Sequence, residues 1–204
     1  MTLRAFIAIA LPPSTRRALT RACEEFRAAE PGSAGEKWVA EQNLHATLRF
    51  IGPLEEDAVP AVVAALEAAC ARHRPFALTL GGVVARPGGR RARMLWATFA
   101  DGLDPSRRLA DDVEQALLGG LDPEAREHAY RPHVTLCRFR KPHRPPDGAL
   151  AAANAVVDAA APSCGIAGPS PGIVSVPGVS LVSSTLSPSG PVYRELAFIP
   201  LDGD

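Results

Sequence analysis

The sequence predicts an α+β fold made of two duplicated β-α-β-α-β units, which form two lobes with a central cleft between them. Three observations lead to this prediction. Strand-like and helix-like segments alternate along the 204 residues, the order of segments repeats after 88 residues, and each copy carries His-x-Thr-Leu on a predicted strand. A site at the contact between the copies would combine one motif from each of them.

The first unit is predicted over residues 3–86. Short runs of apolar and β-branched residues predict its strands, at 3–10, 44–51 and 75–86. Apolar residues at helical spacing predict its helices, at 14–30 and 57–71. Ser14 follows two prolines and is expected to cap the first helix. The sequence PGGR at 87–90 is expected to be the turn that ends the unit.

The second unit is predicted over residues 92–186 and has the same order of elements. Its strands are expected at 92–100, 132–139 and 173–185, its helices at 104–118 and 148–161, and a closing strand at 192–201. Gly119-Gly120 is expected to end the helix 104–118. The Pro/Gly/Ser-rich stretch 162–172 is expected to be a loop insertion, because the strand after it drifts from the 88-residue register.

The composition is typical of a single globular domain spanning 1–204. Hydrophobic residues make up 47% and charged residues 22%, which excludes wholesale disorder and fibrous repeats. The 22 basic residues balance 22 acidic ones, whereas a protein that coats long duplexes normally carries a basic excess. Aromatic residues are only 5%, too few for an extended stacking platform. Any nucleic-acid contact is therefore expected to be local, such as a strand end.

The cysteines and the apolar segments favour a cytoplasmic protein. Cys23, Cys70, Cys137 and Cys164 are scattered without a CxxC pair, and are expected to be reduced and mostly buried. The apolar start of the chain lacks the basic region and cleavage site of a signal peptide, so it is interpreted as a strand. No apolar run reaches the length of a membrane span, and we expect a monomer without a membrane partner.

The two motifs carry the chemistry of the protein. They are His45-Ala46-Thr47-Leu48 and His133-Val134-Thr135-Leu136. With five histidines and eight threonines in 204 residues, chance would give His-x-Thr less than once. Side chains alternate between the faces of a strand, so His and Thr point the same way while their neighbours point to the core. Two such strands facing one cleft bring two imidazoles and two hydroxyls around a common point.

Two imidazoles suit acid–base chemistry near neutral pH, because free histidine titrates near about 6.5. One neutral histidine can take a proton from water while a charged one gives a proton to a leaving oxygen, and the hydroxyls can bind a small anion. This set predicts phosphate-ester cleavage without a metal or other cofactor. Two alternatives remain: a pair of structural histidines, and a zinc site, for which the motifs supply too few ligands.

Four segments carry a resemblance to a known family. They are KWVAEQNLHATLRFIG at 37–52, RMLWATF at 93–99, RPHVTLCRF at 131–139 and LVSSTLSPSGPVYREL at 181–196. Over most of the chain the sequence resembles the RNA 2′,3′-cyclic phosphodiesterases, formerly called 2′-5′ RNA ligases, of the two-histidine phosphoesterase superfamily. The resemblance implies the two-histidine phosphoesterase fold and the hydrolysis of a terminal RNA 2′,3′-cyclic phosphate to a 2′-phosphate.

The resemblance also implies a role for each site residue. His45 would be the proton donor and His133 the proton acceptor, while Thr47, Thr135 and Arg138 would bind the phosphate. Strict strand alternation places Arg138 on the opposite face from His133 unless the strand bulges, whereas Arg49 has the parity to lie beside His45.

Other functions stay open at this point. The partner is expected to be RNA with a 2′,3′-cyclic phosphate end or a small cyclic nucleotide. Another substrate of the superfamily is possible in chemical terms: a 2′-5′ linkage, a cyclic nucleotide or an oligouridine tail. Sealing of 2′-5′ RNA ends is the same chemistry run backwards, so ligation could accompany hydrolysis. A rival of a different class is a non-catalytic module that binds RNA ends or phosphate.

Overall fold

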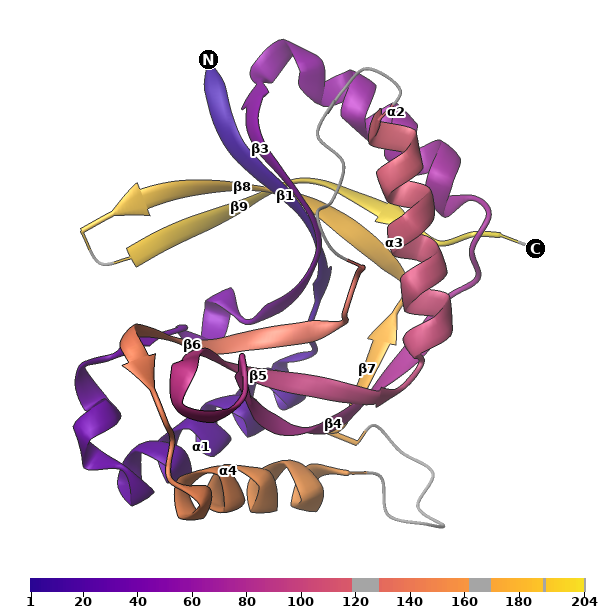
Figure 1. Ribbon diagram of the computed structural model, residues 1–204. Coiled ribbons are helices and arrows are strands. Elements are labelled where there is room, and N and C mark those ends of the chain that lie inside the picture. Colours follow the sequence, from indigo (N-terminus) through magenta and orange to yellow (C-terminus); the bar gives the residue numbers. More distant parts are fainter. Residues whose placement is uncertain (119–128, 162–169, 189, 204) are drawn as a thin grey trace.

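The computed structural model describes residues 1–118, 129–161, 170–188 and 190–203 (Figure 1). The strands are β1 (Thr2–Ala10), β2 (Lys37–Trp38), β3 (His45–Glu55), β4 (Phe76–Arg86), β5 (Ala92–Asp101), β6 (His133–His143), β7 (Ile173–Val176), β8 (Gly178–Ser187) and β9 (Gly190–Pro200). The α-helices of these residues are α1 (Pro13–Ala29), α2 (Val59–Cys70), α3 (Leu103–Leu118) and α4 (Asp147–Ala160). The α+β class and the expected order of elements are thus confirmed.

Three details differ from the prediction or lie beyond it. The first helix begins at Pro13 with Pro12 at its N-cap and no side-chain cap, so the prediction of Ser14 as the cap is wrong. The strand expected at 173–185 is two strands, β7 and β8, interrupted at Pro177. A proline lacks the N–H that a continuous ladder needs, which explains this break. Gly119-Gly120 and Cys164 lie outside the described residues.

All strands belong to one antiparallel sheet with the order β7-β4-β5-β6-β3-β1-β8-β9, and β2 pairs with β6 beside this path. The order is symmetric about the contact between β6 and β3. That contact consists of one residue pair, Ala46 with Val134, and these two residues are 88 positions apart. The duplication therefore appears in the fold as a pseudo-twofold axis that passes between the two motifs.

The two halves of the chain interleave around this axis. β4 of the first half pairs with β5, while β8 of the second half pairs with β1. The helices exchange in the same way, since α1 packs on α4 and α2 packs on α3 (Figure 1). The expected lobes at 3–86 and 92–186 do not match this pairing. The strands on each side of the contact between β6 and β3 come from both halves of the chain.

A continuous core fills the space between the sheet and the helices. Its largest fully buried side chains include Ile7, Leu19, Phe26, Leu66 and Leu136. Cys23, Cys70 and Cys137 are free thiols buried in this core, as expected of small apolar residues. None of the helices in the described parts of the chain is long and apolar enough to cross a membrane.

Candidate active site

The two motifs meet where β3 and β6 join. Ala46 and Val134, the paired residues, are fully buried, and so is Leu136. The histidine and threonine of each motif alternate with these buried residues and are half-exposed on the opposite face of the sheet. The strand periodicity thus brings His45, Thr47, His133 and Thr135 to one face across the pseudo-twofold axis.

Each imidazole is held by the same backbone contact. The Nδ1 atom of His45 lies 2.7 Å from the carbonyl oxygen of Asn43, and that of His133 lies 2.7 Å from the carbonyl oxygen of Arg131. A carbonyl oxygen only accepts, so Nδ1 carries the hydrogen and Nε2 of the neutral ring keeps its lone pair. The Nε2 atom of His45 lies 3.0 Å from Oγ1 of Thr47. The reactive nitrogen of each ring is therefore Nε2.

Aromatic side chains fix the planes of both rings. Trp96 stacks on His133 with a centroid distance of 3.7 Å and an interplanar angle of 20°. Phe6 stacks on His45 at 4.8 Å and 29°, and Tyr193 meets the same ring edge-on at 5.4 Å. Sequence reasoning missed all three of these ring contacts. Only the register between strands brings these residues to the motifs, and no spacing within one strand encodes it.

The environment lowers the pKa of both histidines. Burial is the largest cause for His45 and for His133, since it disfavours the charged ring. The hydrogen bonds to the carbonyls of Asn43 and Arg131 act in the opposite direction. The positive charge of Arg138 lowers the pKa of both rings further, and the charge of His133 lowers that of His45. Both imidazoles are therefore neutral at pH 7 in the ligand-free site.

A β-bulge turns Arg138 toward the site. Leu95 pairs with Cys137 and Trp96 with Thr135, so Leu136 is an extra residue on β6. Leu136 and Cys137 are consequently both buried, and Arg138 returns to the face of Thr135, where its Nη1 atom lies 3.3 Å from Sδ of Met94. This bulge is the irregularity that Arg138 needs in order to share a face with His133.

β3 carries the same bulge, and it removes Arg49 from the site. Ile7 pairs with Arg49 and Ala8 with Thr47, so Leu48 is the extra residue. The Arg49 side chain is 10% exposed and points to α3, where its Nε atom lies 2.9 Å from Oε2 of Glu114. The expectation that Arg49 lies beside His45 is wrong for this reason.

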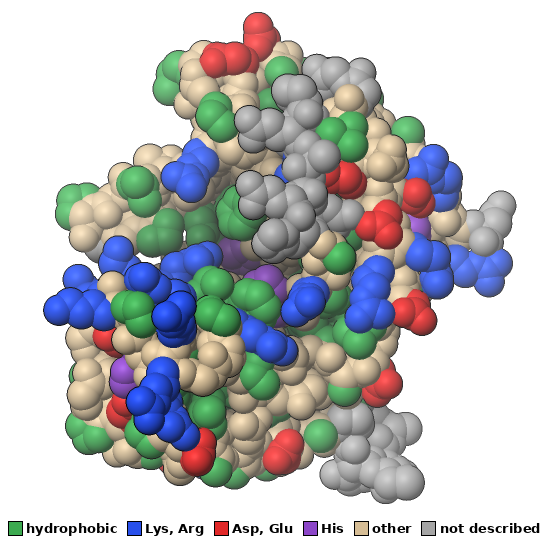
Figure 2. All heavy atoms as spheres, in the orientation of Figure 1, with side chains coloured by type: hydrophobic (Ala, Val, Ile, Leu, Met, Phe, Trp, Pro, Cys, Tyr) green, Lys and Arg blue, Asp and Glu red, His purple; other side chains and the backbone are tan. Residues whose placement is uncertain are grey.

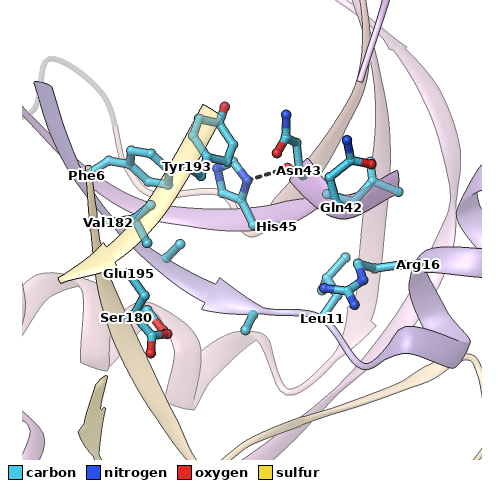
Figure 3. Close-up of a pocket in the computed structure, with 13 residues that line it drawn as sticks. Phe6, Leu11, Arg16, Gln42, Asn43, His45, Ser180, Val182, Tyr193 and Glu195 are labelled. Carbon is cyan, nitrogen blue, oxygen red and sulfur yellow. Dashed lines mark hydrogen bonds between the residues drawn. The ribbon is translucent and has the colours of Figure 1, made fainter. Parts of the chain in front are cut away.

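A cleft of about 660 Å³ opens over the motifs. Its lining includes His45, Thr47, Thr135 and Arg138. Figure 2 shows imidazoles at the bottom of this hollow and Lys and Arg side chains gathered along one rim. A smaller pocket of about 160 Å³ adjoins His45, with Phe6, Val182 and Tyr193 toward one side and Leu11 and Arg16 toward the other (Figure 3).

Two further histidines, His73 and His143, lie outside the cleft. The His73 side chain is only 11% exposed and binds Asp112 at 2.8 Å. His143 binds Glu30 at 2.6 Å. His128 lies outside the described residues. Within the parts of the chain that the structure describes, no group of three or more His, Cys, Asp or Glu side chains is arranged to hold a metal ion.

Known proteins resemble this chain in sequence and in fold. An RNA 2′,3′-cyclic phosphodiesterase of Aeropyrum pernix is 32% identical over 161 residues, which cover 78% of this chain and 83% of that protein. A protein of the same name from Aquifex aeolicus is 29% identical, covering 82% of each chain. The crystal structure of a Thermus thermophilus protein matches with a TM-score of 0.71 and 29% identity, over 98% of this chain and 99% of that one.

Escherichia coli LigT, solved with 3′-AMP, superposes with a TM-score of 0.70 over 98% of this chain and 99% of its own, and at 21% identity it shows the shared fold alone. The α+β fold of this chain is thus the fold of LigT. A family model described as the 2′-5′ RNA ligase superfamily matches residues 12–164, three quarters of the chain. The chain therefore belongs to the 2′-5′ RNA ligase superfamily.

Proposed function

We propose that the protein is an RNA 2′,3′-cyclic phosphodiesterase, which opens a terminal 2′,3′-cyclic phosphate to a 2′-phosphate. One observation carries this proposal: two imidazoles, each held at Nδ1 by a backbone carbonyl, lie on one face of the sheet in equivalent positions about the pseudo-twofold axis. A single imidazole can serve one proton transfer at a time, whereas hydrolysis of a phosphodiester needs an acid and a base together. The names of the relatives from Aeropyrum pernix and Aquifex aeolicus support the same substrate.

In this mechanism the two histidines exchange protonation states. Nε2 of His133 accepts a proton from a water molecule, and the water oxygen attacks phosphorus. The bond between phosphorus and O3′ breaks, and protonated His45 gives its Nε2 proton to O3′. One water is consumed, and the products are a 2′-phosphate and a 3′-hydroxyl. Thr47, Thr135 and Arg138 hold the non-bridging oxygens and stabilise the negative charge of the transition state.

The lowered pKa of His133 suits its role as the base in the free site, whereas His45 can serve as the acid only after substrate binding raises its pKa. His133 is neutral in the free site, as a base must be. His45 must be protonated when substrate is bound, although burial lowers its pKa in the free site. A phosphate anion beside the ring favours its charged form, so substrate binding raises the pKa of His45.

The test is hydrolysis of a short RNA that ends in a 2′,3′-cyclic phosphate, with EDTA present. The wild type should release a 2′-phosphate, and His45→Ala and His133→Ala should each lose about 10²- to 10⁴-fold in kcat. His143→Gln is the matched control, because His143 lies outside the cleft, and it should retain wild-type activity.

Retention of activity by either alanine variant would contradict the two-histidine mechanism. A 3′-phosphate product would contradict the assignment of O3′ as the leaving oxygen. If the RNA binds but is not turned over, the protein is either a binding module for RNA ends or an enzyme for another phosphodiester. A 2′-5′-linked dinucleotide and an oligouridine RNA would then be the next substrates to test.

A further inference from the structure

The two copies of the duplication differ in the side chain that lies beside the motif threonine. Trp96 pairs with Thr135 between β5 and β6, and Ala8 pairs with Thr47 between β1 and β3. Trp96 and Ala8 are 88 residues apart, so they occupy equivalent positions in the two copies. One copy thus carries an indole ring where the other carries a methyl group.

The indole ring lies flat against one face of the His133 imidazole. The two ring centroids are 3.7 Å apart, and the ring planes differ by 20°. In the other copy the ring that stacks on His45 is the phenyl group of Phe6, at 4.8 Å and 29°. The negative face of an aromatic ring attracts a cation within about 6 Å of its centroid, and indole attracts it most strongly. His133 therefore has the closer and the stronger partner for a positive charge.

The polar atom of the indole makes no visible contribution to the site. The Nε1 atom of Trp96 is buried, and it has no hydrogen-bond partner among the residues that the structure describes. A buried indole usually donates this hydrogen, and leaving the bond unmade costs free energy. A leucine or a phenylalanine would carry no such cost. What Trp96 offers to His133 is therefore the face of its ring.

The charges around His133 act against its protonated form. Besides the backbone hydrogen bond at Nδ1, the described neighbours are the cation Arg138 on β6 and the titratable His45 on β3. β5, which pairs with β6 at this point, contributes the uncharged Trp96 and Thr98. Burial and the charge of Arg138 both lower the pKa of His133. A base becomes an imidazolium when it takes a proton, and the face of Trp96 is the neighbouring group that attracts this cation.

We propose that Trp96 is a positioning residue that stabilises the protonated form of His133 through a cation–π contact. Its part in catalysis rests on the proposed function of His133 as the base. When Nε2 of His133 takes the proton from water, the positive charge forms on a ring that already lies against the indole. Trp96 takes no proton itself and acts through His133. The two histidines therefore differ in their ability to hold a proton, although their motifs are alike.

NMR titration of the histidine rings in the free protein tests the contact without any substrate. Trp96→Leu keeps an apolar cover over His133 but removes the aromatic face, so His133 should protonate at a lower pH than in the wild type. Trp96→Phe keeps an aromatic face and should restore most of the wild-type midpoint. The midpoint of His45 should move much less in both variants. A midpoint of His133 that stays or rises in Trp96→Leu would overturn the proposal, because the indole would then act only as apolar cover.

The pH dependence of hydrolysis tests the consequence for catalysis, with RNA that ends in a 2′,3′-cyclic phosphate as substrate. The acid limb of kcat/KM follows His133, which must be unprotonated, so this limb should move to lower pH in Trp96→Leu. The kcat should fall about tenfold while KM stays unchanged, because the lost contact gains its strength only as the proton is transferred. Trp96→Phe should recover kcat to within about threefold of the wild type. An equal fall in both variants would overturn the proposal, since it would point to the shape of the indole.

Phe76→Leu is the matched control for the loss of an aromatic ring from the sheet. Phe76 is a partly buried residue of β4 that pairs with Val176 of β7, and β4 lies two strands from β6. This variant should leave the titration of both histidines and the kcat unchanged. Thermal unfolding of each variant identifies a loss that comes from misfolding.

The two measurements separate this proposal from the proposed function. If the wild type turns over no RNA end but the midpoint of His133 still falls in Trp96→Leu, only the proposed reaction is wrong. If the wild type hydrolyses the RNA end and the midpoint of His133 does not fall, only the role of Trp96 is wrong.

Discussion

Arg138 affects the site through its charge as well as its hydrogen-bonding capacity. Its guanidinium lowers the pKa of both His45 and His133, and it also offers two donors to a phosphate. In the free enzyme the charge of Arg138 opposes catalysis, because a lower pKa disfavours the protonated form of the proposed acid, His45. In the proposed mechanism the charge of the bound phosphate offsets this effect, so Arg138 would make protonation of the acid depend on the presence of substrate.

Arg138→Met tests this dual role through the pH dependence of kcat/KM. Removal of the positive charge raises the pKa of both histidines, so both limbs of the profile should move to higher pH. The acid limb follows His133, which must lose its proton, and the alkaline limb follows His45, which must keep its proton. The maximum of kcat/KM should also fall by about 10²-fold, since an oxyanion donor is lost.

Arg140→Met is the control for this change. Arg140 lies two residues further along β6, and its Nε donates to the carbonyl oxygen of Gly35 at 2.8 Å. Its loss should change kcat/KM less than twofold and leave the profile in place. A profile that does not move in Arg138→Met would show that Arg138 acts on the transition state without tuning the histidines.

At the scale of single elements, two glycines near helix starts predict opposite effects on stability. Gly102, just before α3, has a φ of +76°, and a Cβ there would overlap the carbonyl oxygen of Ala77. Gly102→Ala should lower the free energy of unfolding by more than about 2 kcal/mol. Gly148 in α4 has open space, so Gly148→Ala should raise it by about 0.5–1 kcal/mol. Urea unfolding measures both, and equal effects at the two positions would contradict this account.

The elements also show what a sequence encodes locally and what it does not. β1, β3 and the four α-helices were predictable, because apolar spacing reports directly on the face that an element buries. The bulges at Leu48 and Leu136 were not, because a bulge is a relation between two strands. Alternation within each strand therefore placed both histidines and both threonines on one face correctly. The same alternation put Arg49 on the wrong face, and it carried no signal for the rings of Phe6 and Tyr193.

The largest surprise at the scale of the whole molecule is the exchange of elements between the two halves. A repeat of 88 residues suggests two lobes in sequence order, one for each half. The strand pairing instead joins strands of different halves: β8 of the second half lies beside β1, and β4 of the first half lies beside β5. Since repeats in sequence carry no information on which copy supplies a neighbour, only the fold could reveal this exchange.

Interleaving predicts that neither half folds alone. In a fragment of residues 1–88, β1 lacks β8, β4 lacks both β5 and β7, and α1 lacks α4. We expect the fragments 1–88 and 89–204, cut in the exposed turn after β4, to show no cooperative unfolding separately. Mixed or expressed together, they should assemble, because every missing strand and helix contact lies on the other fragment.

Far-UV circular dichroism and hydrolysis of an RNA 2′,3′-cyclic phosphate measure this assembly. The mixture should regain the helical signal and part of the activity, and His133→Ala in the second fragment should abolish that activity without preventing assembly. A cooperative unfolding transition in either fragment alone would show that the halves are independent lobes. The cleft would then be a junction between two domains, whereas obligate assembly would mean that one shared sheet builds both walls of the site.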